Sequence, residues 1–328
     1  ALQDNGTQYT GGAAGSLWKI ASFDGDGYNS DIYDPDPTDA YVGFGKSFNY
    51  TNGTTGSFGP AANARKSRYF PNPQYPNQKV FVGDWNLMHN NSGTWFSSGI
   101  YSPSSVALNF NSTTYPYAGA SPNCMSAMFK TTYQKYYGTP APAYSISWYP
   151  LYPQAGCNNL VPPTFITKSN DGYNYGSTWY ENYFTNVTQI TNALYDAAKL
   201  ATAITATDVP LLSGITCKPE NGNKVWVCSP MPKPNFKVWG SSDGGTTWTN
   251  ADPNGVFANI PVFEILSVEG PLDILFAGTL DGVYYTDNTM SGNWCRYGGP
   301  SVQVLGLKMN YCKNKLIVST YGRGAFEV

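Results

Sequence analysis

The chain has 328 residues, of which 41% are hydrophobic and 16% aromatic, and its 19 lysines and arginines nearly balance its 21 aspartates and glutamates. This length and apolar content suffice for a full core, whereas a net charge of −2 with only 12% charged residues excludes a basic surface for nucleic acid. No apolar run approaches the roughly 18 residues of a membrane-spanning helix. No signal peptide is present, but Ala1 opens within a motif, and we expect a leader or more of the chain upstream.

The N-terminal region begins with a strand-like motif and continues into the only dense acidic run of the chain. Ala1–Thr7 has the sequence A-L-Q-D-N-G-T. The later landmarks are Trp18, Asp24–Gly25–Asp26–Gly27, Asp34–Pro35–Asp36–Pro37 and Tyr41. Asp24, Asp26 and Asp31 are weak candidates for calcium ligands. The EF-hand pattern fails because Asn29 and Pro35 replace its glycine and its bidentate glutamate, so a tight turn and a solvated connection are the alternative. We predict no cofactor.

Asn-x-Ser/Thr sequons mark candidate glycosylation sites. Their number is close to the chance expectation for so much Asn, Ser and Thr, so position decides between them. Asn5 lies inside the strand motif and is the least expected to carry a glycan. The candidates, most of which we place in polar loops, are Asn49, Asn52, Asn90, Asn111 and Asn186.

Four short β-rich runs, bounded by Gly, Pro and Asn, predict strands. In chain order they are Lys79–Val82, Thr164–Thr167, Lys224–Val227 and Ile274–Thr279. Each precedes a full or partial copy of one turn motif, S-x-D-x-G-x-T-W, known as the Asp-box. In this motif the Ser and Asp side chains bond their own turn, glycine adopts a positive φ, and tryptophan packs between sheets.

The copies of the Asp-box recur along the chain. Asn91–Trp95 keeps only the G-T-W end, and Thr286–Asp287 with Gly292–Trp294 is a decayed copy. The second copy contains Ser169, Asp171, Gly176, Thr178 and Trp179, with Tyr173–Tyr175 inserted in its turn. The complete copy contains Ser241, Asp243, Gly245, Thr247 and Trp248.

A recurring strand–hairpin–strand unit of about 40–50 residues predicts an all-β chain folded as a β-propeller of six or seven blades. We expect one domain over 1–328, with the weakest motifs between 50 and 160. A β-sandwich is the alternative, but it gives no reason for the Asp-box to recur. The segment Gln189–Ala201 breaks the β pattern, because its apolar residues fall at helical spacing. It predicts one short helical insertion that packs over a blade edge or, alternatively, binds a partner.

The six cysteines are even in number and contain no C-x-x-C pair for zinc. Cys217 and Cys228 flank Asn221–Gly222, a hairpin turn signal, and we predict a disulfide between them. Cys295 and Cys312 flank the strand Leu305–Leu307 and form the second predicted pair. Cys124–Cys157 is the pair that remains. Disulfides indicate an oxidising compartment; six buried free thiols are the alternative.

The C-terminal segment Thr320–Phe326, together with the N-terminal motifs, carries a family resemblance. T-Y-G-R-G-A-F is similar to the closing T-x-G-R-G-x-W strand of Asp-box (BNR-repeat) β-propellers of the sortilin/xyloglucanase-like group, with Phe326 in the place of tryptophan. Ala1–Thr7 and the landmarks up to Tyr41 resemble that group's G-x-Q-D-N-G-T strand and the sequence after it. The group includes hydrolases, sorting receptors and secreted surface proteins, so the resemblance implies the fold more than the function.

The sequence contains no complete catalytic set. Propeller hydrolases need paired carboxylates, and the unassigned ones are Asp24, Asp26, Asp84 and Asp281. A sialidase needs three arginines and an F/Y-R-I-P motif. The chain lacks that motif, and two of its four arginines, Arg296 and Arg323, have structural explanations. The single histidine is His89. The sequence contains no G-x-S-x-G nucleophile motif with which it could form a Ser–His–Asp triad, and we place it in a turn.

These features favour a non-catalytic, secreted propeller that acts as a structural or adhesive surface protein. Its expected partners are copies of itself or neighbouring extracellular proteins, with attached or bound glycans. The most specific version of this hypothesis is a fibre subunit that joins its neighbours through strand edges. The alternatives are a hydrolase acting on a neutral glycan and a receptor that binds a peptide or glycan in the central channel.

Overall fold

The computed structural model describes the strands between residues 7 and 189, the single positions 142, 190, 193, 194, 197 and 198, and all of 212–328. Within these residues the regular elements are β-strands, apart from four helical positions inside the predicted insertion, namely Ala193, Leu194, Ala197 and Ala198. Leu194 and Ala198, one turn apart, are fully buried, which favours packing over partner binding for the insertion. The all-β prediction is confirmed.

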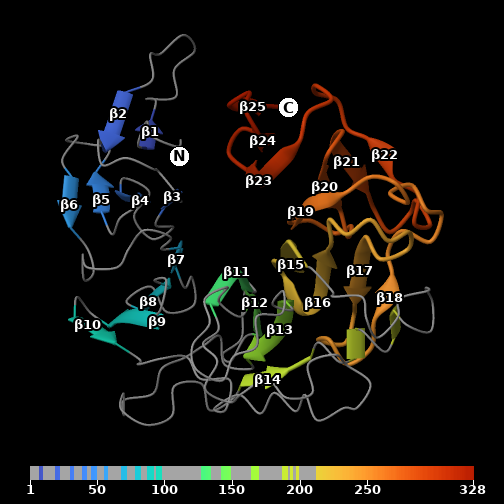
Figure 1. Cartoon of the computed structure of the whole chain (residues 1–328), viewed down its shortest axis with the longest axis horizontal. Coiled ribbons are helices and arrows are strands. Elements are labelled where there is room, and N and C mark those ends of the chain that lie inside the picture. The colour runs from blue at the N-terminus through green and yellow to red at the C-terminus, as the bar shows by residue number, and fades with distance from the viewer. Residues whose placement is uncertain are drawn as a thin grey trace. The chain divides into compact units, whose positions relative to one another are not determined.

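The chain divides into two compact units, labelled by their strands in Figure 1. The first unit holds β1 to β10, the second holds β12 to β25, and β11 has residues in both.

The first unit contains one two-stranded and two four-stranded sheets, in each of which every strand pairs with the next along the chain. The strands are β1 (Thr7–Tyr9) and β2 (Lys19–Ser22); β3 (Ser30–Ile32), β4 (Asp39–Val42), β5 (Lys46–Asn49) and β6 (Thr55–Ser57); and β7 (Arg68–Pro71), β8 (Gln78–Val82), β9 (Leu87–Asn91) and β10 (Thr94–Ser97).

The remaining strands form three four-stranded sheets and one three-stranded sheet with the same consecutive pairing. They are β11 (Ala127–Tyr133), β12 (Ala143–Trp148), β13 (Thr164–Ser169) and β14 (Val187–Gln189); β15 (Gly214–Lys218), β16 (Asn221–Cys228), β17 (Val238–Ser241) and β18 (Thr249–Asn250); β19 (Val262–Ser267), β20 (Leu275–Thr279), β21 (Gly282–Thr286) and β22 (Cys295–Arg296); and β23 (Val304–Asn310), β24 (Lys315–Thr320) and β25 (Ala325–Glu327).

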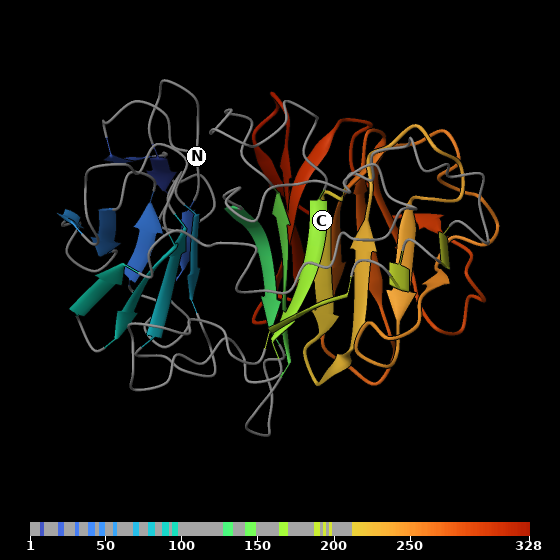
Figure 2. The ribbon, with the colours of Figure 1, turned by 60° about the horizontal axis from the view of Figure 1, so that its bottom comes forward.

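Consecutive antiparallel pairing sorts the turns between the two ends of each sheet, as the alternating arrows of Figure 2 show. The turn that joins the first two strands of a sheet and the turn that joins its third and fourth strands lie at the same end, which we call the hairpin edge. Second-to-third turns and the links between sheets lie at the opposite edge. The first strands of successive sheets are neighbours: β15 lies beside β19, and β19 beside β23. This is the arrangement of consecutive propeller blades, while the number of blades stays a prediction.

The core of the second unit lies between successive sheets, because neighbouring residues of a strand point to opposite faces. On β20, Leu275 and Ala277 face the β15–β18 sheet, where they join Trp226, Cys228, Val238, Phe257, Val262, Ile265 and Trp294. Phe276, between them, faces the other way and packs with Val268, Val283, Val304, Leu316 and Val318.

The hairpin between β15 and β16 differs from the prediction. Its turn is Pro219–Glu220, since Lys218 pairs with Asn221, and a bulge separates this pair from Cys217 and Val225. Asn221 and Gly222, the predicted turn, lie instead in the bulged start of β16. Proline at the first central position of a turn fixes the φ that the turn requires, and it outcompetes the local Asn-Gly signal here.

Candidate functional site

The turn between β17 and β18 is built by the side chain of Asp243. Its Oδ1 accepts hydrogen bonds from the backbone N–H groups of Thr246 and Thr247 at 3.0 and 2.9 Å, and its Oδ2 accepts one from the Thr247 hydroxyl at 2.6 Å. The Ser241 hydroxyl donates to Asp243 at 2.8 Å and accepts the Gly245 N–H at 2.8 Å. The five Asp-box positions thus satisfy the polar groups of their own turn.

Two glycines let this turn lie against the preceding sheet. Gly244 and Gly245 have φ values of +73° and +90°, a region that glycine occupies without strain. A Cβ at Gly244 would overlap Lys168 Nζ, and one at Gly245 would overlap Ile190. Trp248, 5% exposed, closes the turn by donating its indole N–H to the Gly245 carbonyl at 3.1 Å. The residues of the motif therefore hold their own turn and pack it against the preceding sheet.

The hydrogen bonds from Thr247, Ser241 and Thr246 hold the pKa of Asp243 at about 2, below its ordinary value of 3.8. This carboxylate is exposed, so salt and water screen its charge and the bonds themselves carry the effect.

We predict that Asp243→Asn lowers the melting temperature at neutral pH, because it weakens the acceptor of these bonds. A carboxylate whose pKa is lower in the folded state than in the unfolded state stabilises the fold at pH values above its unfolded pKa. This stabilisation is lost as the pH falls through the folded pKa. The difference between wild type and variant should therefore shrink as pH falls from 3.8 to about 2. Circular dichroism melts across this window measure it, and a difference that does not vary with pH would contradict this role of the carboxylate.

The other predicted copies of the motif lie at the same topological position, the turn from the third to the fourth strand of a sheet. Ser169 ends β13, and Asn91 ends β9 and pairs with Thr94 of β10. Asp171, Gly176, Thr178 and Trp179 lie outside the described residues. In the decayed copy, Asp287 accepts hydrogen bonds from the backbone and hydroxyl of Thr289, and buried Trp294 donates to the Ala251 carbonyl at 2.9 Å.

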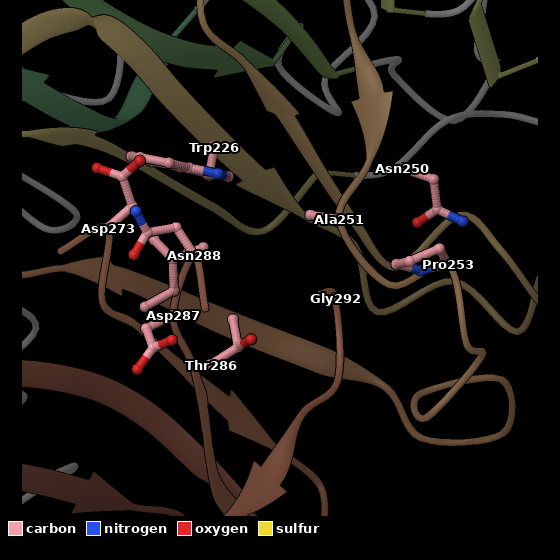
Figure 3. Close-up of a pocket in the computed structure, with 10 residues that line it drawn as sticks. Trp226, Asn250, Ala251, Pro253, Asp273, Thr286, Asp287, Asn288 and Gly292 are labelled. Carbon is pink, nitrogen blue, oxygen red and sulfur yellow. The ribbon is translucent and has the colours of Figure 1, made fainter. Parts of the chain in front are cut away.

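A pocket of about 300 Å³ opens between the β15–β18 and β19–β22 sheets (Figure 3). Trp226, Asp273, Asp287 and Asn288 gather on one side of it, and Asn250 and Pro253 lie on the other. Ala251, Leu275, Thr286 and Gly292 complete the lining. The pocket therefore combines an aromatic ring, two carboxylates and two amides. Sequence reasoning missed it, because its residues come together only when two sheets pack.

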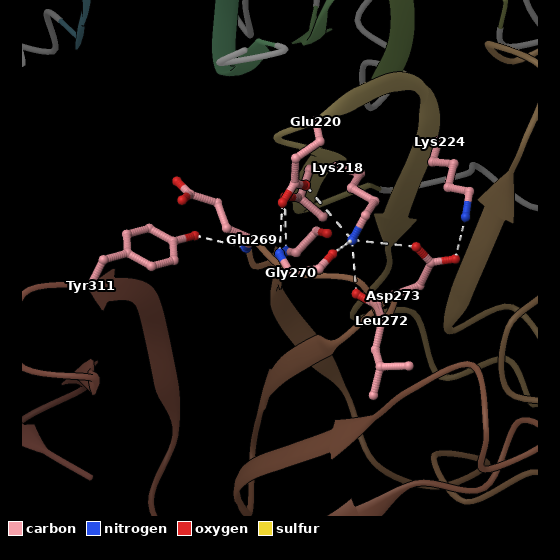
Figure 4. Close-up of polar contacts among 10 residues, drawn as sticks. Lys218, Glu220, Lys224, Glu269, Gly270, Leu272, Asp273 and Tyr311 are labelled. Atoms are coloured by element: carbon pink, nitrogen blue, oxygen red, sulfur yellow. Dashed lines mark hydrogen bonds and ion pairs between the residues drawn. The ribbon is translucent and has the colours of Figure 1, made fainter.

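A second polar cluster ties three successive sheets together at the hairpin edge (Figure 4). Buried Lys218 donates to the carbonyls of Gly270 and Leu272 at 2.9 and 2.8 Å and lies 3.4 Å from Asp273. Asp273 also pairs with Lys224 at 2.5 Å.

The same cluster extends in both directions along the hairpin edge. Glu220 accepts the Gly270 N–H at 2.6 Å. The Tyr311 hydroxyl accepts the Glu269 N–H at 3.0 Å, and burial raises the pKa of Tyr311 to about 12. These contacts join the first turns of the sheets that begin with β15, β19 and β23.

Of the candidate catalytic carboxylates, only Asp281 is among the described residues. Asp281 lies in the turn between β20 and β21, where its backbone N–H bonds the Thr279 hydroxyl at 3.0 Å and its carboxylate lies 3.5 Å from the Tyr284 hydroxyl. Asp24, Asp26 and Asp84 lie outside the described residues, and Asp31 is part of β3. In the described part of the chain, no three His, Cys, Asp or Glu residues gather as metal ligands.

Three further predicted positions lie in strands, not in turns or loops. His89 is in the middle of β9, paired with Val80 and Phe96, which corrects the turn prediction. Asn90 of the same strand and Asn49 at the end of β5 are likewise strand residues. Alternating polar residues in a strand resemble a polar loop when the sequence is considered alone. The candidates Asn52, Asn111 and Asn186, and Asn5, lie outside the described residues.

Neither of the predicted disulfides, Cys217–Cys228 and Cys295–Cys312, is formed in the structure. Cys217 is opposite Val225 and Cys228 is opposite Gly214, so the two cysteines lie three register positions apart and point to opposite faces. Cys217 meets Thr132 of β11, whereas Cys228 faces the core shared with the next sheet. Cys295 lies on the last strand of its sheet, and Cys312 lies in a turn of the next. Cys124 and Cys157 lie outside the described residues.

No family model and no curated protein matches the chain. Solved structures do. An ancestral GH74 enzyme matches 92% of this chain and 36% of its own, at 15% identity and a TM-score of 0.56. The extracellular domain of a protein designated a hybrid two-component system from B. thetaiotaomicron matches 94% of this chain and 34% of its own, at 10% identity and a TM-score of 0.56. PorZ, an essential surface component of the type-IX secretion system of Porphyromonas gingivalis, matches 92% of this chain and 38% of its own, at 12% identity and a TM-score of 0.54.

At these identities the likeness establishes the fold alone, which is of the β-propeller type. The chain spans little more than a third of the length of these structures. Among the described residues, no helix has the length and apolar character needed to cross a membrane.

Proposed function

We propose that the chain is a non-catalytic β-propeller of an extracellular surface that joins its neighbours through strand edges. The observation that carries the proposal is the outer edge of β25. This strand ends the three-stranded sheet β23–β24–β25, and no described strand pairs with its outer side.

The hydrogen bonds of β25 show which backbone groups are available. Leu316 and Val328 exchange both of their backbone hydrogen bonds, at 3.0 and 2.9 Å, and Gly324 accepts from Thr320 at 2.9 Å. Because antiparallel bonds alternate along a strand, the N–H and C=O groups of Ala325 and Glu327 point away from β24. Such a row of polar groups is a template for an added strand from another molecule.

The low charge of the chain supports a surface role. With 12% charged residues, about half the usual share, the exterior depends on Tyr, Ser, Thr, Asn and Gln. The carboxylates of the described pocket also have structural tasks: Asp273 pairs with lysines, and hydrogen bonds from Thr289 lower the pKa of Asp287. The lowered pKa makes Asp287 unsuited to act as the general acid of a glycosidase, which needs a raised pKa.

We further propose membership of the Asp-box propellers of the sortilin/xyloglucanase-like group. Its support is the geometry of the Ser241–Trp248 turn and the common position of the other copies. An extracellular setting is supported by the neighbours, which include an extracellular domain and a bacterial surface component.

The proposal predicts that Glu327→Pro abolishes self-association and leaves the monomer folded. Proline removes the outward N–H of Glu327 but none of the bonds to β24, and proline is tolerated at sheet edges. Glu327→Ala, which keeps the N–H, is the matched control and should assemble like wild type. Negative-stain electron microscopy and light scattering of the purified chain measure assembly. A wild-type chain that stays monomeric at high concentration, or a Glu327→Pro variant that still assembles, would refute strand addition.

The second candidate is a hydrolase of a neutral glycan, which the match to an ancestral GH74 enzyme favours. Incubation with neutral β-glucans, followed by reducing-end analysis, separates the two. If the chain cleaves such a glucan and a single Asp→Asn substitution abolishes the cleavage, the non-catalytic proposal is refuted. Asp281 is the candidate for this substitution that lies within the described residues.

A further inference from the structure

The indole N–H of Trp226 is the starting observation. Four tryptophans lie within residues 212–328, and three of them donate their indole N–H to a backbone carbonyl: Trp239 to Asn235, Trp248 to Gly245 and Trp294 to Ala251. Trp226 is only 9% exposed, yet its N–H has no acceptor among the described residues. A buried indole N–H ordinarily finds a partner.

This N–H borders the pocket between the sheets instead of being sealed in the core. In the described part of the chain, the only sealed polar side-chain atom without a partner is Ser267 Oγ, so Trp226 Nε1 is accessible. Trp226 lines the pocket, and Figure 3 shows its nitrogen-bearing edge turned toward the side where Ala251 and Asn250 lie. The pocket thus presents an unused donor at its wall.

The other polar groups of the pocket offer both donors and acceptors. The oxygen of Asn250 is taken by the Asp252 N–H at 2.8 Å, which leaves its NH₂ group as a donor. Asp287 receives both Thr289 bonds on Oδ1, and its Oδ2 retains acceptor capacity. The exposed amide of Asn288 supplies one of each. The charge of Asp273 is balanced by Lys224 and Lys218.

This mixture selects the class of ligand. A cation would face the donors of Trp226 and Asn250, and an anion would face the carboxylate of Asp287. A hydroxyl group both donates and accepts, so a neutral polyhydroxylated molecule matches every position. Trp226, Pro253 and Leu275 add apolar surface for the C–H face of a ring. A volume of about 300 Å³ is at the small end of ligand pockets.

We propose that the pocket between the β15–β18 and β19–β22 sheets binds one neutral hexopyranose unit of a saccharide. Trp226 donates to a ring hydroxyl, Asp287 and Asn288 accept from others, and the apolar wall contacts the ring face. This site is separate from the β25 edge and does not depend on assembly.

The test follows the indole ¹⁵N–H signal of Trp226 in the full chain, assigned by its loss in Trp226→Phe. Methyl glucopyranoside, methyl mannopyranoside, methyl galactopyranoside and cellobiose are titrated into the millimolar range. At least one of them should shift the signal saturably. Saturable binding of lysine methyl ester or acetate with no response to any of the sugars would overturn the assignment, as would no response to any probe.

Two variants test the assigned contacts. Trp226→Phe keeps an aromatic side chain at this position and removes the N–H donor together with part of the ring that packs over Gly240. Asn288→Ala removes an exposed amide that has no bond within the described residues, so the fold should be unaffected. Calorimetry should show each variant binding the responsive sugar roughly 3- to 10-fold more weakly, the worth of one neutral hydrogen bond. Trp239→Phe, at a tryptophan that does not line the pocket, should bind like wild type, and equal affinity in all three variants would refute the contacts.

The outcome is distinguishable from that of the proposed function. Sugar binding without polymer formation would support the pocket and refute strand addition, and polymer formation without sugar binding would do the reverse. Cleavage of cellobiose that is lost in Asp287→Asn would show an active site and contradict both the binding-only pocket and the non-catalytic proposal.

Discussion

Trp248→Ala should destabilise the chain by about 3–5 kcal/mol, the usual cost of removing a buried aromatic side chain. Trp248 is 5% exposed, and its N–H closes the Asp-box turn on the Gly245 carbonyl. The substitution leaves a cavity and also frees that carbonyl, while the turn loses the side chain that anchors it. Urea unfolding followed by tyrosine fluorescence and circular dichroism gives the change in midpoint.

Tyr321→Ala is the control for this measurement. Tyr321 is 72% exposed in the turn between β24 and β25, so its loss should change the free energy of unfolding by less than about 0.5 kcal/mol. Equal effects of the two substitutions would mean that Trp248 does not anchor the turn.

Lys218→Met is expected to cost about 2–4 kcal/mol, because it removes the shared donor of the cluster at the hairpin edge. Methionine keeps the apolar stem but leaves the carbonyls of Gly270 and Leu272 without the partner at 2.9 and 2.8 Å. Asp273 retains Lys224, which limits the loss of charge pairing. Thermal unfolding and urea titration of the full chain measure the effect.

Lys313→Met serves as the matched lysine control. Its ammonium group lies 4.0 Å from Glu327, and both side chains are about half exposed, so this pair should contribute at most about 1 kcal/mol. A Lys218→Met variant as stable as Lys313→Met would show that the cluster is not a source of stability.

The features that the sequence predicted well are those encoded within a few residues. The turn at Ser241–Trp248 is such a case, since Ser241, Asp243 and Gly245 interact within one turn and their spacing determines the contacts. The strands around Lys79–Val82 and Lys224–Val227 were likewise evident from local β propensity. The common position of the motif copies in the third-to-fourth turns follows from the repeat and needs no long-range information.

Features that depend on register or on packing between sheets were beyond the sequence. Two turn signals, Pro219 and Asn221–Gly222, compete in one hairpin, and choosing the wrong one shifts the partner of every later residue. The error in Cys217–Cys228 has the same origin in register. Lys218 meets partners some fifty residues away. The only local hint was a lysine as the last residue of an otherwise uncharged strand, and the residues of the Trp226 pocket gave no comparable hint.

The cluster at the hairpin edge has a consequence for how the second unit responds to force. Glu220 holds Gly270 of the next sheet, and the adjacent Glu269 is held by Tyr311 of the sheet after it. Tension applied to one of these sheets must load the bonds to its neighbour before the sheet can peel away. We therefore expect the three sheets to yield as one mechanical element, with a single large rupture in a pulling experiment rather than a sawtooth of three small ones.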